Sequence, residues 1–187
     1  MIDFWYWKKA INSDKINQIN DFIDNNFEGY EEENQSATYL DGTRKKNNIV
    51  KCIKWKEIKH FLENLEQSIN IVNQENFGYH LYPFTGYEET LLNIYPADQQ
   101  ARYDWHSDES RSYSFDFKFT VLINVSKENY EGGDFELNIG GNPKKIEDFT
   151  DPGDILMFKS YMIHRVLPIL SGERRTLALF VKGPKFR

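Results

Sequence analysis

The sequence predicts an α+β domain in which helices come first and a β-sheet then closes as a sandwich or a small barrel. Two segments in the first 75 residues carry apolar residues at helical spacing, and the segments after them are short, rich in aromatic and β-branched residues, and separated by glycine turns. Helices followed by many short strands are typical of this class. The chain has 187 residues, which is long enough for one domain with a buried core.

The first predicted helix runs from Ser13, its expected N-cap, to Phe27, and the second runs from Trp55 to Asn70. Apolar residues recur every three or four positions in both helices, so each helix should bury one face. Between them, residues 29–50 are polar and lose this periodicity. Such a segment is typical of a solvent-exposed loop, and a mobile lid over a substrate is the functional alternative.

The strands are predicted from short runs of Val, Ile, Phe and Thr, which favour extended structure. They are expected over Phe77–Phe84, Glu89–Tyr95, Asp116–Val125, Phe135–Ile139, Ile155–Phe158, Met162–Val166 and Thr176–Val181. Glycine- and proline-containing breaks separate them, such as Gly140-Gly141-Asn142-Pro143. The sequence has no internal repeat or linker, so residues 1–187 should form a single domain.

Composition limits the compartment and the partners. A formal net charge of −6 and a pI of about 5.3 disfavour a broad nucleic-acid-binding surface. Cys52 is the only cysteine, which excludes an internal disulfide and favours a reducing compartment. No apolar run approaches the ~20 residues of a membrane span, and the aromatic start of the chain is too short for a signal peptide. We therefore expect a soluble cytoplasmic protein without a nucleic-acid or membrane partner; the composition indicates no oligomeric state.

The chemistry is concentrated in His106-Ser107-Asp108 and the distant His164. In an extended segment His106 and Asp108 point to the same side, so both can face one ion. Two imidazoles and one carboxylate on one face of a metal are the ligands of non-haem Fe(II) oxygenases. The His-x-Asp pattern alone is a weak signal, and a hydrogen-bonded core histidine beside a turn carboxylate is the alternative. Zinc or manganese in place of iron also stays open.

Arg174 follows His164 by ten residues (174 − 164) and is a candidate anion-binding residue. Strand alternation puts Arg174, Thr176, Ala178 and Phe180 on one face, and Arg175, Leu177, Leu179 and Val181 on the other. A buried guanidinium without a partner is costly, so an inward Arg174 predicts a bound carboxylate. Tyr95 and Tyr103 are candidate donors to the same carboxylate. The alternatives are surface charge for the arginine and core packing for the tyrosines.

Six motifs between Tyr95 and the C-terminus share their order and spacing with a known family. They are Trp105-His106-Ser107-Asp108, Lys118-Phe119-Thr120, residues 130–137, Pro152-Gly153-Asp154, residues 164–168 and Gly172-Glu173-Arg174. This part of the chain resembles the Fe(II)/2-oxoglutarate-dependent dioxygenases. Within that family it is similar to the prolyl-4-hydroxylase-like branch, and there to the small phage-encoded and bacterial members.

The resemblance implies a double-stranded β-helix (jelly-roll) over about residues 76–187, with helical support over about residues 1–75. It also implies roles for individual residues. These are Fe(II) ligands at His106, Asp108 and His164; 2-oxoglutarate contacts at Arg174, Tyr103, Tyr95, Thr120 and Thr176; and substrate contacts at Trp105 and Arg165. Dioxygen is the implied second co-substrate, and ascorbate is a candidate reductant.

The implied reaction is oxidative decarboxylation of 2-oxoglutarate to succinate and CO2, coupled to hydroxylation of a substrate C–H bond. The leading hypothesis for the substrate is a prolyl residue in a protein or peptide. A free amino acid, lipid or other metabolite with the same cofactors is a second hypothesis, and a non-catalytic or cupin-like metal-binding module is a third. An extended groove beside the metal favours a peptide, and a closed pocket favours a metabolite. If the chain is phage-encoded, the expected location is the host cytoplasm.

Overall fold

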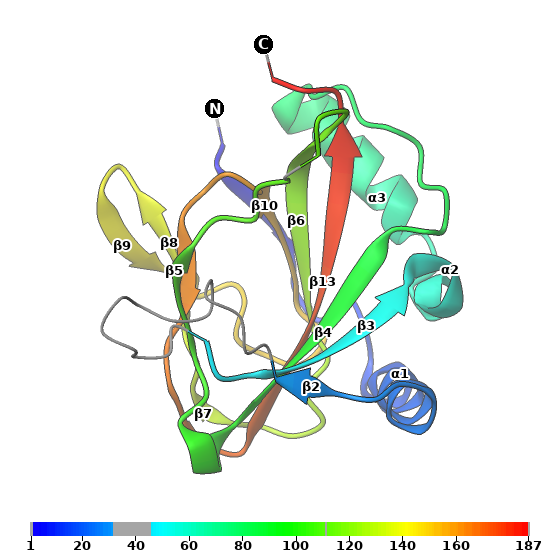
Figure 1. Cartoon of the computed structure of the whole chain (residues 1–187). Helices are drawn as coiled ribbons and strands as arrows, with labels where there is room; N and C mark the ends of the chain where they lie inside the picture. Colours follow the sequence, from blue (N-terminus) through cyan, green and yellow to red (C-terminus); the bar gives the residue numbers. More distant parts are fainter. Residues whose placement is uncertain (1, 32–45, 111, 187) are drawn as a thin grey trace.

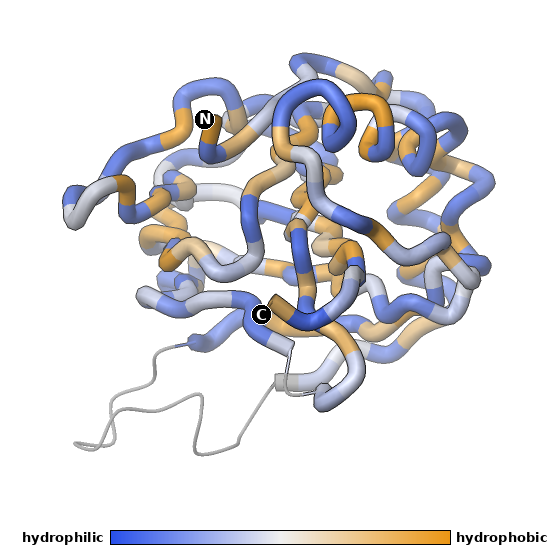
Figure 2. The backbone as a smooth tube through the Cα atoms, turned by 90° about the horizontal axis from the view of Figure 1, so that it is seen from above, coloured by the Kyte–Doolittle hydropathy of each residue, from blue (hydrophilic) through white to orange (hydrophobic). Residues whose placement is uncertain are grey.

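Two antiparallel sheets face each other at the centre of the molecule, and three α-helices lie against the outer face of the larger one (Figure 1). The structure is a computed structural model that describes residues 2–31, 46–110 and 112–186. Figure 2 shows hydrophobic and hydrophilic residues intermixed along the backbone. Because successive side chains of a strand point to opposite faces of its sheet, each central strand has one face toward the helices and one face toward the second sheet.

The larger sheet has seven strands in the order β1-β10-β6-β13-β4-β3-β2. Their bounds are Phe4–Trp7 (β1), Tyr30–Glu31 (β2), Ile49–Lys54 (β3), Glu89–Pro96 (β4), Asp116–Asn124 (β6), Ile155–Lys159 (β10) and Glu173–Gly183 (β13). Every neighbouring pair is antiparallel. The long strand β13 lies between β6 and β4, where Leu177 is opposite both Ile123 and Leu92.

The smaller sheet has four strands in the order β5-β11-β8-β9. Their bounds are Tyr103–His106 (β5), Phe135–Ile139 (β8), Asn142–Lys145 (β9) and His164–Val166 (β11); β7 (Glu131–Gly132) and β12 (Ile169–Ser171) form a separate pair. Four strands of the larger sheet, β10-β6-β13-β4, face these four. Two antiparallel four-stranded layers make a jelly-roll, so the predicted fold is confirmed.

The helices are α1 (Ser13–Asn26), α2 (Trp55–Ile58) and α3 (Leu65–Val72), with 3-10 turns over Lys59–Phe61 and Ala97–Gln99 and a π-helix over Asn73–Phe77. The N-cap of α1 is Asn12 and not Ser13, because the Asn12 side chain accepts the Lys15 N–H at 2.9 Å. The single helix predicted over Trp55–Asn70 is interrupted. Asn64, the residue before α3, has a left-handed backbone with φ of 66°, which no regular helix accommodates.

Two strand predictions also differ from the structure. The segment Phe77–Phe84 pairs with no strand in the described ranges; its apolar side chains pack directly on the helix-side core. The predicted break at residues 140–143 is confined to Gly140 and Gly141, whose φ angles are 61° and 86°. Asn142 and Pro143 already belong to β9, an edge strand of the smaller sheet, where proline is tolerated.

The N-terminal region contributes strands as well as helices, because β1, β2 and β3 all belong to the larger sheet. The segment expected as a loop or lid over residues 29–50 supplies β2 and the start of β3 at its two ends. Its residues 32–45 lie outside the described residues. In the described ranges, no helix combines the length and apolarity that a membrane crossing requires.

Two apolar cores result from this arrangement. The first lies between the helices and the larger sheet, and it contains Ile19, Ile23, Leu177 and Leu179. The second lies between the two sheets and includes Leu122, Leu137, Phe158 and Ala178. The opposite orientation of Leu177 and Ala178 confirms the alternation predicted for β13. The candidate site opens within the second core.

Candidate metal centre

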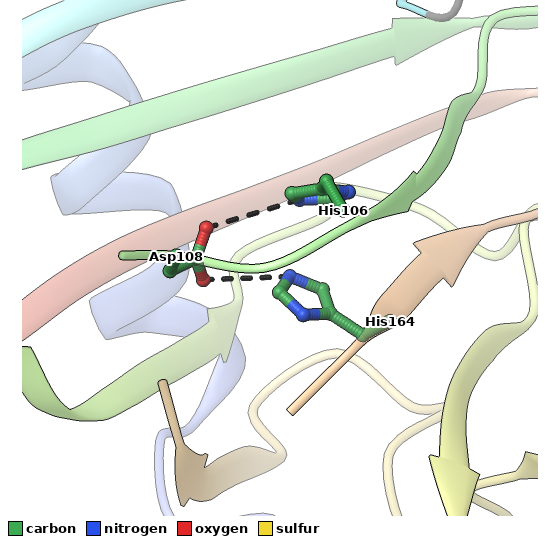
Figure 3. A group of neighbouring side chains, drawn as sticks. All are labelled: His106, Asp108 and His164. Carbon is green, nitrogen blue, oxygen red and sulfur yellow. Dashed lines mark ion pairs between the residues drawn. The ribbon is translucent and has the colours of Figure 1, made fainter. Parts of the chain in front are cut away.

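Three side chains with metal-ligating atoms meet at one end of the smaller sheet. His106 ends β5, His164 begins β11, and the two residues are directly opposite in the strand pairing. Asp108 lies two residues after β5, where its N–H donates to the Ser160 carbonyl at 2.9 Å. The three ligand atoms lie within 4.8 Å of one another. Figure 3 shows the Asp108 carboxylate facing both imidazole rings, so the predicted cluster forms.

Backbone carbonyls determine which ring nitrogens face Asp108. Nδ1 of His106 lies 2.7 Å from the Asp104 carbonyl, and Nδ1 of His164 lies 2.9 Å from the Met162 carbonyl. Because a carbonyl only accepts, each Nδ1 must carry the hydrogen. The Nε2 atoms therefore present lone pairs, and they lie 3.8 and 3.4 Å from the Asp108 carboxylate oxygens. This is the orientation in which two imidazoles bind a metal.

The surroundings of His106 keep its ring neutral. Burial, then the neighbouring His164, and then Lys46 lower the pKa of His106 to about 2, against the opposing hydrogen bond to Asp104. The His106 ring also stacks on Tyr103, with centroids 3.5 Å apart and planes at 10°. A neutral imidazole is the form that ligates a metal. Two imidazoles and a carboxylate thus fit a divalent ion that keeps open coordination positions.

Hydrogen bonds also orient Asp108. The Thr120 hydroxyl donates to its carboxylate at 2.8 Å and lies 3.0 Å from the Ser160 hydroxyl. Thr120 does not line the cavity beside the metal ligands, so its placement differs from the direct co-substrate contact that we expected. Its hydroxyl instead orients the carboxylate of Asp108, a candidate metal ligand. Ser160 was not predicted, because a single serine after a strand gives no sequence signal.

A cavity of about 220 Å³ separates the two sheets beside this cluster. The expected residues Arg174, Thr176, Tyr95 and Tyr103 line it together with the three ligands, and Lys46 and Asn93 were not predicted. Strand pairing places these residues, since Arg174 is opposite Tyr95, Thr176 is opposite Asn93, and Lys46 bridges to Tyr103. Arg174, Thr176, Ala178 and Phe180 all line the cavity, so the residues that alternation grouped on one face of β13 form its inward face.

Arg174 is a buried cation whose hydrogen bonds are incomplete. It is 1% exposed, and its Nε and Nη2 have no partner in the described part of the chain, as is also true of the Thr176 hydroxyl. Burial raises the pKa of the nearby Tyr95 phenol to about 12, although the Arg174 charge lowers it and Asp108 raises it. That phenol stays a neutral donor. A buried guanidinium with free N–H groups, next to two hydroxyls, is a site for a carboxylate.

Trp105 and Arg165, the candidate substrate contacts, lie outside this cavity. The Arg165 guanidinium is 4.3 Å from the Trp105 ring centroid, and its Nε donates to Glu136 at 2.7 Å. Both residues are neighbours of metal ligands in sequence, and the alternation of their strands turns them away from the cavity. The three side chains form a packed group of their own.

Residues 90–182 match the 2OG-Fe(II) oxygenase superfamily. The chain belongs to this superfamily. A PKHD-type hydroxylase of Synechococcus sp. (strain CC9605) is 36% identical over 74 residues, which cover 38% of this chain. The matched part is 32% of that relative's length, so the chain spans about a third of it.

Solved structures with the same fold cover nearly the whole chain. A prolyl-4-hydroxylase of Pseudomonas putida superimposes with a TM-score of 0.69 at 15% identity, covering 98% of this chain and 94% of its own. The viral collagen prolyl hydroxylase of Paramecium Bursaria Chlorella virus-1 gives a TM-score of 0.68 at 14% identity, covering 97% of each chain. These superpositions show the shared fold, and the superfamily match confirms the resemblance to the Fe(II)/2-oxoglutarate-dependent dioxygenases.

Proposed function

We propose that this protein is an Fe(II)- and 2-oxoglutarate-dependent hydroxylase that acts on a prolyl residue of a protein or peptide. One observation carries the proposal: the His-Asp-His cluster and the incompletely bonded Arg174 line the same cavity. A metal-binding module would need only the cluster. An anion site next to the metal suits a co-substrate that has a second carboxylate.

In this proposal the residues of the cavity bind either the metal or the co-substrate. His106, Asp108 and His164 would hold iron, which supplies the redox chemistry with dioxygen. Arg174 would bind the distal carboxylate of 2-oxoglutarate through its free N–H groups, and the phenol of Tyr95 would donate to the same carboxylate. Because the cavity lies between the two sheets, water has limited access to it, and charge–charge interactions there are strong.

The cavity is small, which favours a substrate that enters it with only one part of a longer molecule. A volume of about 220 Å³ lies below the roughly 300–1,000 Å³ of pockets for drug-sized ligands, and the co-substrate must share it. Leu91 and Phe180 line this cavity and also an adjoining groove of about 390 Å³. This geometry suits one side chain of a longer molecule entering the cavity while the rest lies outside. That the superimposed structures are prolyl hydroxylases supports a prolyl target.

The first test combines purified protein with Fe(II) and 2-oxoglutarate without oxygen and records the visible charge-transfer band. We expect a band in the wild type, no band in His164→Ala, and a band in Arg174→Ala only at much higher 2-oxoglutarate. His80→Ala is the matched control, because this exposed histidine lies outside the cavity. Proline-containing peptides would then be assayed for a mass gain of one oxygen. The absence of a band at saturating iron and 2-oxoglutarate would contradict the proposal.

A further inference from the structure

The groove of about 390 Å³ adjoins the cavity that contains the His-Asp-His cluster, which is called the catalytic cavity below. The net charge of this groove differs from that of the protein as a whole. Its walls include the aromatic residues Phe115, Phe117 and Phe180 and the charged residues Lys54, Lys182 and Glu89. Two lysines and one glutamate give it a formal charge of +1 (2 − 1), whereas the chain carries −6. A positive groove on an acidic protein favours a ligand that is negatively charged at this place.

The floor of the groove is a set of half-buried aromatic rings. Phe117 and Phe180 stack with centroids 4.9 Å apart and planes at 25°, and Phe115 lies 5.7 Å from Phe117. Since Phe180 also lines the catalytic cavity, the aromatic floor begins where the cavity ends. Aromatic grooves of this kind bind extended, proline-containing chains.

Lys182 is the cation of the groove that lacks an internal partner. Its Nζ lies 5.0 Å from the centroid of the Phe115 ring, and it has no ion pair with any residue in the described ranges. Lys54 does pair with Glu89, at 3.0 Å, but the two side chains are 44% and 65% exposed. An exposed pair of this kind is weak, so an incoming carboxylate can exchange with Glu89.

We propose that the groove binds the part of a peptide substrate next to the target residue, and that Lys182, assisted by Lys54, selects an acidic side chain in that part. This inference rests on the proposed hydroxylase function and narrows its substrate class. The aromatic floor contacts the extended backbone of the peptide, and the two lysines attract its acidic side chain. Because the groove adjoins the cavity at Phe180, the acidic residue lies within a few positions of the target.

The test uses short synthetic peptides with one central proline and neutral flanks. Glutamate is placed at each flanking position in turn, with glutamine at the same position as the matched peptide. Binding to protein loaded with Fe(II) and 2-oxoglutarate without oxygen is measured by fluorescence anisotropy. At one position we expect glutamate to bind on the order of fivefold more tightly than glutamine, the upper range for an exposed charge pair. The preference should weaken as salt is added.

Variants assign the preference to the groove. Lys182→Gln should reduce it strongly, Lys182→Arg should keep it, and Lys182→Glu should reverse it, so that the glutamine peptide binds more tightly than the glutamate peptide. Lys59→Gln is the control, since it removes the same charge from an exposed position outside the groove. Equal binding of glutamate and glutamine peptides at every position would overturn the inference, as would a preference that survives loss of both groove lysines.

The charge-transfer band of the same samples separates this inference from the proposed function. A band without any glutamate preference, or without any peptide binding, overturns the groove inference alone. A glutamate preference that depends on Lys182, in a sample without a band, supports the groove and contradicts the cofactor assignment. Both measurements use the complete chain.

Discussion

Arg174 and Arg175 are consecutive residues of β13, both buried, and they have opposite surroundings. Arg175 is 4% exposed on the helix side, where its two terminal nitrogens donate to the Asp24 carboxylate at 2.9 and 2.6 Å. Arg174 is 1% exposed on the cavity side, where two of its nitrogens have no partner in the described part of the chain. An arginine buried with its acid supports the fold, and one buried without an acid indicates a ligand.

The two sides of the strand also differ in how completely their charges are compensated. Asp24 accepts from Lys51 at 2.8 Å and from Lys127 at 3.2 Å in addition to Arg175. The hydrogen bond from Arg175 is the main cause of the lowered pKa of Asp24, against burial, with Lys51 adding to it. This network joins α1 to the sheet and pairs the Arg175 charge with an acid without a ligand. Of the Arg175 nitrogens, only Nε lacks a hydrogen bond among the described residues, and it lies 3.9 Å from the Glu173 carboxylate. On the cavity side, Nε and Nη2 of Arg174 have no partner among the described residues, which is the arrangement that the proposed anion site requires.

The largest expected effect comes from Arg174→Leu. Removing one partner of a buried charge pair costs about 2–5 kcal/mol of binding, so the Kd for 2-oxoglutarate should rise by about 30-fold or more. The ligand-free protein should be as stable as the wild type or more stable, because an apolar side chain replaces an uncompensated charge. Titration of the charge-transfer band gives the affinity, and urea unfolding gives the stability. A variant that unfolds readily would show that Arg174 supports the fold.

Asp24→Asn should show the reverse pattern. It leaves the Arg175 charge without its acid; such losses cost about 3–5 kcal/mol when fully buried. Since Asp24 is about one third exposed, we expect the free energy of unfolding to fall by about 2–3 kcal/mol after screening. The affinity for 2-oxoglutarate should stay within about twofold, because distant sites are additive. Asp21→Asn, an exposed residue of the same helix, is the control. An equal fall in the free energy of unfolding in Asp24→Asn and Asp21→Asn would show that the ion pair of Asp24 with Arg175 does not stabilise the fold.

Part of this contrast was predictable from the sequence because strand alternation follows a period of two. That rule placed Arg174 and Thr176 on one face of the strand and Arg175 and Leu177 on the other, without deciding which face points inward. The ligands were predictable because only a few residue types bind metal at such spacing. The same alternation explains why Trp105 and Arg165 lie outside the cavity, since a neighbour in sequence along a strand faces the other way.

Features that depend on distant segments were not predictable. Lys46 and Asn93 reach the cavity through pairing with Tyr103 and Thr176, and a single lysine or asparagine carries no signal of such a partner. Strand β1 was missed because four residues give too short a pattern. Phe77–Phe84 was predicted as a strand because its aromatic residues are also frequent in strands, but tertiary packing of these side chains decides its structure.

Thr120→Val tests whether the cavity side depends on hydrogen bonds as well as on charge. The change keeps the shape of the side chain and removes the hydroxyl that donates to Asp108 at 2.8 Å. We expect metal affinity to weaken by about 10–100-fold, the usual effect of losing such a partner. The Kd for 2-oxoglutarate at saturating metal should not change. Thr90→Val is the control, because the buried Thr90 hydroxyl has no hydrogen bond among the described residues. Equal metal affinities in both variants would contradict the role of Thr120.

The smallest effect is a dependence of stability on pH that belongs to the helix side of β13. The pKa of Asp24 is lowered in the folded protein, so the unfolded chain binds its proton more readily. The stability that Asp24 contributes is therefore present above its unfolded pKa of about 3.9 and is lost as the pH falls below that value. In urea unfolding from about pH 6 to about pH 3, wild type and Asp24→Asn should converge by about 1–2 kcal/mol, a magnitude reduced by solvent screening. A gap that stays constant over this range would show that the Asp24 charge does not stabilise the fold, and the contrast between the two arginines would then depend on Arg174 alone.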